Sequence, residues 1–232
     1  MNNAGGGATL ASMRESRAQR VARAGRIRRA LARSYPDAHC ALRYDTPFQL
    51  LVATILSAQC TDAKVNEVTA VLFRDYGTPR ALADAQPAEI EAIVRPTGFY
   101  RQKTRSILAT ARDVVERFGG RVPKTLEELT SLRGVARKTA NVVLGNAFDV
   151  PGLAIDTHMQ RVHQRLGLTC SRDPVRIERE LAAIVPQPEW TTYSHRVIQH
   201  GRVCCDARRP RCPTCPLAAD CPWPGRTGSQ RS

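Results

Sequence analysis

Apolar residues recur at helical spacing along most of the chain, and no stretch alternates apolar and polar residues as a half-buried strand does. In residues 15–34, Val21, Ala24, Ile27 and Leu31 fall on one side of a predicted helix, and arginines cover the rest. Further helices are predicted from residue 46, from about residue 61, and over 79–83, 87–94, 101–118, 174–185 and 190–203. The pattern predicts an all-α fold without a solenoid repeat.

Capping residues set the beginnings of several helices. Thr46 followed by Pro47 is a typical helix start, and Thr125 with Glu128 forms a capping-box pattern that opens a short helix. Gly134 ends this short helix, and a longer one continues to about residue 148. Asp156 or Thr157 caps the next helix. The segment around Gly134 therefore predicts two helices joined by a tight turn.

Length and charge narrow the class of protein. The chain has 232 residues, enough for one large or two small domains, and a net charge of +14. Such an excess of positive charge indicates a polyanionic partner, nucleic acid before membrane. No apolar stretch reaches the length of a membrane span, and the N-terminus lacks an apolar signal core. We expect a cytoplasmic protein whose Gly- and Ala-rich residues 1–14 are disordered.

Four cysteines near the C-terminus are candidate metal ligands. Cys205, Cys212, Cys215 and Cys221 are separated by gaps of six, two and five residues. Zinc usually takes two cysteine pairs separated by a longer stretch, so this compact loop favours a four-thiolate iron–sulfur cluster, with zinc as the alternative. The arginines of the loop can neutralise the thiolates or face phosphates: Arg202, Arg208, Arg209 and Arg211. The other cysteines are expected to be ordinary small buried residues: Cys40, Cys60, Cys170 and Cys204.

The turn at Gly134 is a candidate phosphate site, and a lysine follows it. Backbone N–H groups at the start of the second helix suit a phosphate oxygen. Lys138, one of only four lysines, lies in the first turn of that helix. Arg133, Arg137 and the helix N-terminus disfavour a protonated amine there, and arginine can never supply a neutral one. A phosphate-binding surface lysine is the alternative.

Asp156, in the stretch AIDTH, follows an apolar approach and precedes a helix. Taken alone, it is best interpreted as a helix cap. Paired with Lys138, its carboxylate could take a proton from the amine or stabilise a developing cationic sugar.

The stretches SAQCTD, TGFYRQK, LRGVARKTANVVL and AIDTH and the cysteine loop occur in an order that closely resembles endonuclease III, of the helix-hairpin-helix DNA glycosylases, over about residues 25–222. The resemblance implies DNA bound between two helical domains. A six-helix domain would span 46–155, and a discontinuous iron–sulfur domain would combine 15–45 with 156–222, followed by a tail at 223–232.

The resemblance also implies a function. A monomeric bifunctional DNA glycosylase and AP lyase would remove damaged pyrimidines, in particular oxidised ones, from double-stranded DNA or act on abasic sites. Lys138 would be the nucleophile, Asp156 its partner, and the four cysteines would hold a [4Fe–4S] cluster. Gln59 would fill the space left by the flipped base, and Phe99 would be a wedge, with a core aromatic as the alternative. Asp62 and His158 lie in family motifs without an assigned step.

The hairpin departs from the family pattern Leu-Pro-Gly-Val-Gly. Arg133 replaces the proline and Ala136 the second glycine, within the expected DNA-contacting residues Arg133, Gly134, Val135, Ala136 and Arg137. Ala136 is expected to lack the needed tolerance of positive φ, and Arg133 to add a compensating charge. Two alternatives stay open: an adenine mismatch glycosylase of the same superfamily, which usually lacks the lysine, and a weakly active or non-catalytic DNA-binding paralogue.

Overall fold

The computed structural model describes residues 15–223, so the expected disorder of residues 1–14 and nearly all of the predicted tail lie outside the described residues. Between residues 15 and 223 all regular secondary structure is helical, which confirms the predicted all-α fold. None of these helices is both long and apolar enough to cross a bilayer.

The α-helices are α1 (Arg17–Ser34), α2 (Pro47–Leu56), α3 (Asp62–Tyr76), α4 (Pro79–Ala83), α5 (Pro87–Val94), α6 (Tyr100–Phe118), α7 (Leu126–Thr130), α8 (Arg137–Ala147), α9 (Thr157–Arg165), α10 (Pro174–Ala182) and α11 (Trp190–Val203). Short 3-10 helices are η1 (Arg95–Thr97), η2 (Gln187–Glu189), η3 (Cys212–Thr214) and η4 (Ala218–Asp220).

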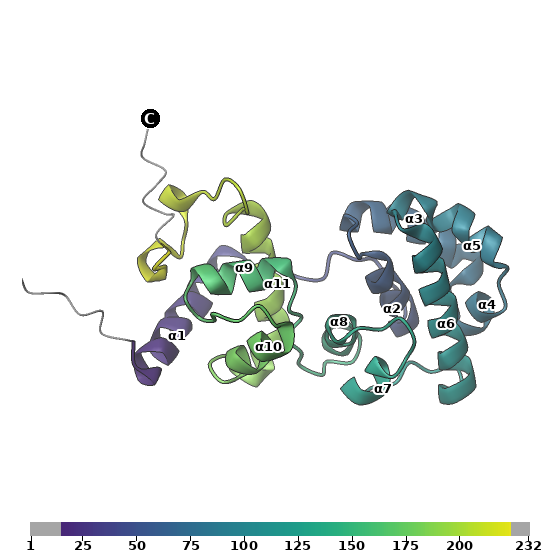
Figure 1. Ribbon diagram of the computed structural model, residues 1–232, viewed down its shortest axis with the longest axis horizontal. Helices are drawn as coiled ribbons and strands as arrows, with labels where there is room; N and C mark the ends of the chain where they lie inside the picture. The colour runs from purple at the N-terminus through teal and green to yellow at the C-terminus, as the bar shows by residue number, and fades with distance from the viewer. Residues whose placement is uncertain (1–14, 224–232) are drawn as a thin grey trace, which may run out of the picture.

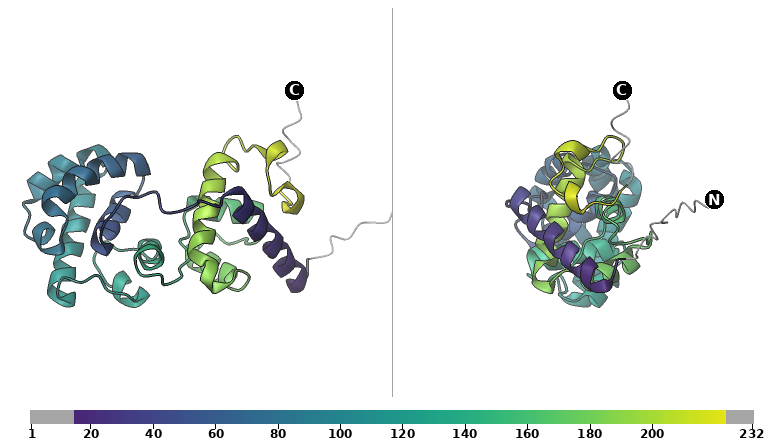
Figure 2. Two further views of the ribbon diagram at one scale, coloured as in Figure 1. Left: turned by 180° about the vertical axis from the view of Figure 1, so that it is seen from behind. Right: turned by 90° about the vertical axis from the view of Figure 1, so that its left-hand side faces the viewer.

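The helices form two lobes, each with its own hydrophobic core. Helices α2 to α8 make one lobe, while α1, α9, α10, α11 and the C-terminal loop make the other (Figure 1). The chain crosses between the lobes after α1 and again after α8, and both crossings are also visible from behind (Figure 2). The domain limits at residues 45 and 155 stay a prediction; Leu42 packs in the first core and Leu153 in the second.

Helix α2 is the centre of the first lobe. Nine of its ten residues are buried, and it packs against α3, α6 and α8. It begins as the sequence predicts, because Thr46 Oγ1 accepts a hydrogen bond from Gln49 N at 3.2 Å and Pro47 occupies the first turn. Because α2 is buried and packs against α8, it fixes the position of α8, whose first turn contains Lys138.

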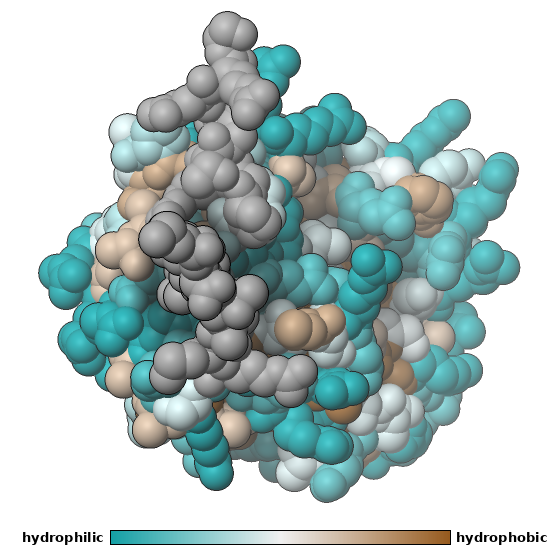
Figure 3. Space-filling model, turned by 60° about the vertical axis from the view of Figure 1, so that its left-hand side comes forward, coloured by the Kyte–Doolittle hydropathy of each residue, from teal (hydrophilic) through white to brown (hydrophobic). Residues whose placement is uncertain are grey.

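Some expectations about burial are wrong. Val21 is 41% exposed, so α1 buries only Ala24, Ile27 and Leu31. Among the cysteines expected to be buried, Cys204 alone is buried; Cys170 is exposed, and Cys40 and Cys60 are half-buried. Periodicity locates a helix face, but it cannot tell how far the neighbouring elements extend over that face. On the face shown in Figure 3 hydrophilic side chains dominate, with small apolar patches between them.

Candidate active site and metal centre

A pocket of about 330 Å³ lies between the lobes and receives residues from both. Lys138, at the start of α8, and Asp156, just before α9, both line it although they are 18 residues apart in sequence. The remaining lining comes from the loop at residues 37–42, from α2 and the residue after it, from the first residue of α3, from Val142 of α8 and from α11. The fold thus brings the two sequence-predicted residues into one cleft.

Local structure explains how each is held. Asp156 Oδ1 accepts a hydrogen bond from Met159 N at 2.8 Å, which is the predicted helix cap. The cap uses only Oδ1, so the second carboxylate oxygen can serve the cleft. Lys138 is the second residue of α8 and is exposed.

The two arginines near Lys138 are engaged elsewhere. Arg137 Nε and Nη2 donate to the two carboxylate oxygens of Glu178, at 2.7 and 2.8 Å, and this ion pair links α8 to α10. Arg133 pairs in a similar way with Asp113 of α6. Each guanidinium therefore has a carboxylate partner that offsets its positive charge, and the expected effect of the two arginines on the Lys138 amine stays a prediction.

Helix α11 adds polar groups to the cleft that sequence reasoning missed. His195, Gln199 and Arg202 line it, at spacings of four and three residues that put them on one helix face. Arg202 forms an ion pair with Asp62 at 2.8 Å, so it does not neutralise the cysteine loop as expected. Burial lowers the pKa of His195 to about 4, and its Nε2 lies 2.8 Å from Asn146 Oδ1, so the ring is neutral near pH 7.

His158 lies beside the cleft without lining it. Its Nδ1 is 3.1 Å from Nη2 of Arg161, and burial lowers its pKa. These contacts give His158 a packing role at the start of α9 and no evident chemical one.

The hairpin turn contributes to a second pocket, of about 340 Å³, on the same side of α8 as Gln59 and Phe99. Gly134 has φ +88°, and a Cβ there would lie 2.9 Å from Ser106 Cβ, so the turn requires glycine. Ala136 has φ −83°, which any residue adopts. The expected backbone conflict at Ala136 is therefore wrong, because the positive φ of the turn falls on Gly134. Val135 is buried in the first core.

Gln59 and Phe99 both have left-handed backbone conformations, with φ of 53° and 47°. Each costs on the order of 1–2 kcal/mol for a non-glycine residue, and such strain often occurs at functional sites. Phe99 is 64% exposed, so the alternative of a core aromatic is wrong. Buried Lys103 steadies this loop, since its Nζ donates to Thr97 O at 2.7 Å.

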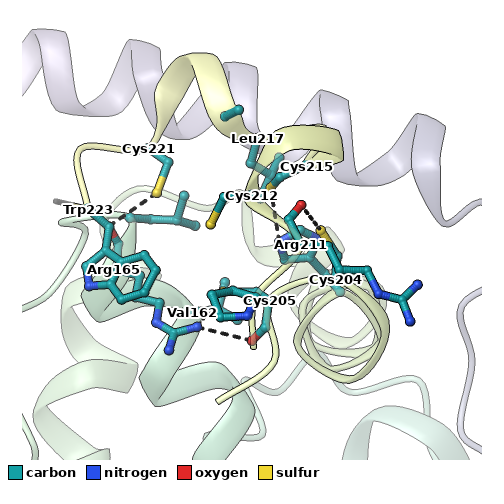
Figure 4. A pocket seen from close by; sticks show the side chains of 14 residues that line it. Val162, Arg165, Cys204, Cys205, Arg211, Cys212, Cys215, Leu217, Cys221 and Trp223 are labelled. Atoms are coloured by element: carbon teal, nitrogen blue, oxygen red, sulfur yellow. Dashed lines mark hydrogen bonds between the residues drawn. The ribbon is translucent and has the colours of Figure 1, made fainter. Parts of the chain in front are cut away.

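The four predicted metal ligands converge around one cavity in the second lobe (Figure 4). Apolar side chains complete its wall: Val162, Leu166, Leu217 and Trp223. Burial raises the pKa of Cys215 to about 12, so its free thiol keeps a proton at neutral pH that a bound metal must displace. Four cysteines that line one largely apolar cavity fit a metal centre.

Arg165, which sequence reasoning missed, is the arginine that contacts this centre. It donates to Cys205 Sγ at 3.3 Å and to the carbonyls of Asp206 and Ala207 at 2.6 and 2.8 Å. Its guanidinium also stacks on Trp223, 4.2 Å from the ring centre. A cation so placed offsets thiolate charge and orders the start of the loop. Arg208, Arg209 and Arg211 of the loop are exposed, and of these Arg211 also lines the cavity.

Comparison with known proteins follows from this geometry. Residues 52–187 match the family described as HhH-GPD superfamily base excision DNA repair protein. Endonuclease III of Synechocystis sp. is 50% identical over 214 residues, which cover 92% of this chain and 98% of that protein. A non-covalent endonuclease III–DNA complex matches with a TM-score of 0.86 and 42% identity over 91% of this chain and 99% of that one. A trapped endonuclease III–DNA covalent intermediate matches with a TM-score of 0.84 and 43% identity over 90% and 99%.

Proposed function

The chain belongs to the HhH-GPD superfamily of base excision DNA repair proteins, with endonuclease III as its close relative, and on that premise we propose how it acts. It is a DNA glycosylase and AP lyase whose partner is DNA that contains a damaged base or an abasic site. Its proposed substrates are oxidised pyrimidines in double-stranded DNA, flipped out of the duplex into the cleft between the lobes.

The convergence of Lys138 and Asp156 in that cleft is the observation that carries this proposal. Lys138 is the proposed nucleophile. Its amine nitrogen bonds to C1′ of the deoxyribose, the bond from C1′ to the base breaks, and the base leaves with the electron pair and gains a proton. The bonded nitrogen then loses one proton, and its lone pair forms the double bond to C1′ as the C1′–O4′ bond breaks and O4′ takes a proton, which leaves an iminium on the opened sugar. Loss of a proton from C2′ then expels the 3′ phosphate, which nicks the strand.

Asp156 is the proposed carboxylate partner. A general base positioned near the attacking amine typically contributes about 10²–10⁴-fold to a rate. The capping hydrogen bond to Met159 N fixes the Asp156 side chain without using its second oxygen. That oxygen can accept the amine's proton or stabilise the positive charge that develops on the sugar.

The hairpin is the proposed phosphate contact. Ala136 is the N-cap of α8 and offers no side-chain cap, so the first-turn N–H groups of this helix can bind a phosphate oxygen. Arg133 is turned towards Asp113, which leaves the backbone as the main donor. Phe99 is the proposed wedge and Gln59 the proposed filler of the vacated stack, supported by their shared pocket beside the hairpin.

The cavity in the second lobe is the proposed site of a [4Fe–4S] cluster. Cys205, Cys212, Cys215 and Cys221 would each supply a thiolate. When bound, the cluster would tie the C-terminal loop to α9 and α11. Its proposed role in this chain is to hold that loop, since the cleft with Lys138 is lined by other residues.

An adenine mismatch glycosylase is the second candidate, because it shares the superfamily fold. The presence of Lys138 in the cleft favours lyase chemistry instead. A non-catalytic DNA-binding paralogue is a further alternative; the ordinary φ of −83° at Ala136 and the presence of Lys138 in the cleft favour the catalytic proposal over it. We propose that the protein works as a monomer at the nucleoid, in the cytoplasm of a bacterium, where its DNA lies.

The test is excision from oligonucleotide duplexes that carry an oxidised pyrimidine, a uracil, an adenine mismatch or an abasic site. We expect base release and strand nicking with the oxidised pyrimidine, and nicking with the abasic site. Base release from the adenine mismatch alone, without nicking, would identify the second candidate instead.

A further inference from the structure

A second group of candidate metal ligands overlaps the cysteine cavity and includes residues outside the four-cysteine spacing. The ligand atoms of His200, Cys204 and Cys215 all lie within 4.8 Å of one another. His200 and Cys204 are buried, and Cys215 is half-buried. His200 Nε2 is 3.8 Å from Cys215 Sγ.

The distance between His200 and Cys215 is close to the spacing of two ligands on one tetrahedral ion. Zinc bonds to sulfur at about 2.3 Å and to imidazole nitrogen at about 2.0–2.1 Å, which gives a nitrogen–sulfur edge of roughly 3.6 Å. His200 Nε2 and Cys215 Sγ lie 3.8 Å apart. Imidazole and thiolate are also the donors that zinc prefers, whereas magnesium and calcium take oxygen.

A hydrogen bond with Tyr35 orients the imidazole of His200. Tyr35 Oη lies 3.0 Å from His200 Nδ1, and both side chains are buried. Ligating histidines usually hydrogen-bond through the second ring nitrogen, which fixes the ring and the nitrogen that faces the metal. Tyr35 thus fixes the ring of His200 with Nε2 towards Cys215.

We propose that His200, Cys204 and Cys215 form a zinc site that the chain uses when the four-cysteine centre is not assembled. The fourth position opens to the cavity, where a further thiol or a water completes the tetrahedron. Because Cys215 belongs to both groups, zinc here and a cluster on the four cysteines exclude each other. Zinc would keep the C-terminal loop fastened to α11 when iron is scarce.

Cobalt(II) is the probe, since it replaces zinc in tetrahedral sites and absorbs visible light. The full-length chain is stripped of iron anaerobically with a chelator and titrated with cobalt(II). We expect one tetrahedral cobalt per chain, with charge-transfer bands from thiolates. Absence of a tetrahedral cobalt spectrum in the wild-type chain would overturn the proposal.

Two cysteine variants separate the overlapping groups. Figure 4 draws Cys204 and Cys221 on opposite sides of the cavity, and Cys221 Sγ contacts Arg165 O at 3.5 Å. Cys204→Ser should keep wild-type iron and sulfide but weaken cobalt binding at least about 10-fold, because a thiolate ligand is lost. Cys221→Ser should lose the iron and sulfide but keep cobalt. The reverse pattern would show that the metal uses only the four spaced cysteines.

A third variant tests the nitrogen ligand of the proposed site. His200→Gln removes the nitrogen donor and leaves every cysteine in place, so it should also weaken cobalt binding. Far-ultraviolet circular dichroism checks that each stripped chain keeps its helices.

Chains produced in iron-limited, zinc-supplemented medium give the same comparison without stripping. One zinc in the wild type and none in Cys204→Ser supports the site, and equal zinc contents refute it. Base excision plays no part in these readouts, so a failure of the proposed function would leave this test intact.

Discussion

Arg133 forms hydrogen bonds to Asp113 from both its guanidinium and its backbone N–H. The guanidinium donates to Asp113 Oδ1 from Nε at 3.0 Å and from Nη2 at 2.7 Å, and Arg133 N donates to Oδ2 at 2.8 Å. Asp113 is buried on α6, so the pair fastens the hairpin turn to the first lobe. The side chain expected to meet a DNA phosphate is thus a structural contact of the turn.

The first prediction concerns acid stability. The hydrogen bonds from the Arg133 guanidinium hold the pKa of Asp113 below its usual range. A lowered folded pKa means that this stabilisation is complete above the unfolded pKa, about 3.9, and is lost as pH falls through the folded value. Urea unfolding of the wild type and Asp113→Asn from pH 6 to pH 3 should show a stability difference that shrinks at the acidic end. A difference that stays constant across this range contradicts the assignment.

Gly134→Ala should destabilise the protein and weaken its DNA binding. A non-glycine residue at φ +88° costs on the order of 1–2 kcal/mol, and the new Cβ also meets Ser106. Gly119→Ala is the matched control, because its φ is +59° but no atom lies within 4 Å of its added Cβ. Thermal unfolding should rank Gly134→Ala as the more damaging change. Equal DNA affinities for the two variants would remove the hairpin from the interface.

Lys138→Arg should keep the positive charge and much of the DNA affinity but abolish covalent chemistry. Arginine is not deprotonated in proteins and cannot form the iminium. Borohydride reduction during reaction with damaged DNA should trap the wild type and leave the variant untrapped. Equal trapping of the variant would identify another amine as the nucleophile.

Asp156→Asn should reduce single-turnover excision by about 10²–10⁴-fold, because the carboxylate is lost. Asparagine is an equally good helix cap, so thermal stability should change little. If stability and activity fall together, Asp156 acts only as a helix cap. Circular dichroism melts and the excision rate on one duplex check both halves of this prediction.

Phe99→Ala should impair excision while leaving stability almost unchanged, within about 0.5 kcal/mol, because the ring is 64% exposed. Phe48→Ala is the contrasting change, since Phe48 is buried in the first core and such truncations cost about 3–5 kcal/mol. Urea unfolding and excision from an oxidised-pyrimidine duplex provide the two readouts. Normal excision by Phe99→Ala would rule out the wedge.

Local sequence signals predicted much of the helical framework. Thr46, Thr125 and Asp156 each accept the capping hydrogen bond that their positions in the sequence indicate. Such bonds span three residues, so both partners are visible in a short stretch of sequence. The end of the helix predicted over 174–185 was less accurate, because α10 stops at Ala182. Helix ends depend on what packs against the last turn.

Partners that are distant in the chain escaped sequence reasoning. The sequence predicts that Arg133 contacts DNA, but in the structure it forms hydrogen bonds with Asp113, 20 residues away. Arg165 contacts Cys205, 40 residues away, and no sequence signal indicates that contact. An arginine can extend in many directions, and no local pattern states which carboxylate or thiol will be in reach. His195 in the cleft is a similar case. The sequence shows on which face of its helix His195 lies, but it does not show which element packs against that face.

The helices, the turn glycine, the lysine and aspartate motifs and the four spaced cysteines can be identified in the sequence, because periodicity, caps and short spacings act within a few residues. The folded structure was needed to see that Lys138 and Asp156 share a cleft, that Phe99 is exposed, and that Cys204 and His200 lie beside Cys215. Those relationships depend on how two separately packed lobes place their helix ends in space. Burial and long-range contact set that placement, and no stretch of a few residues contains either.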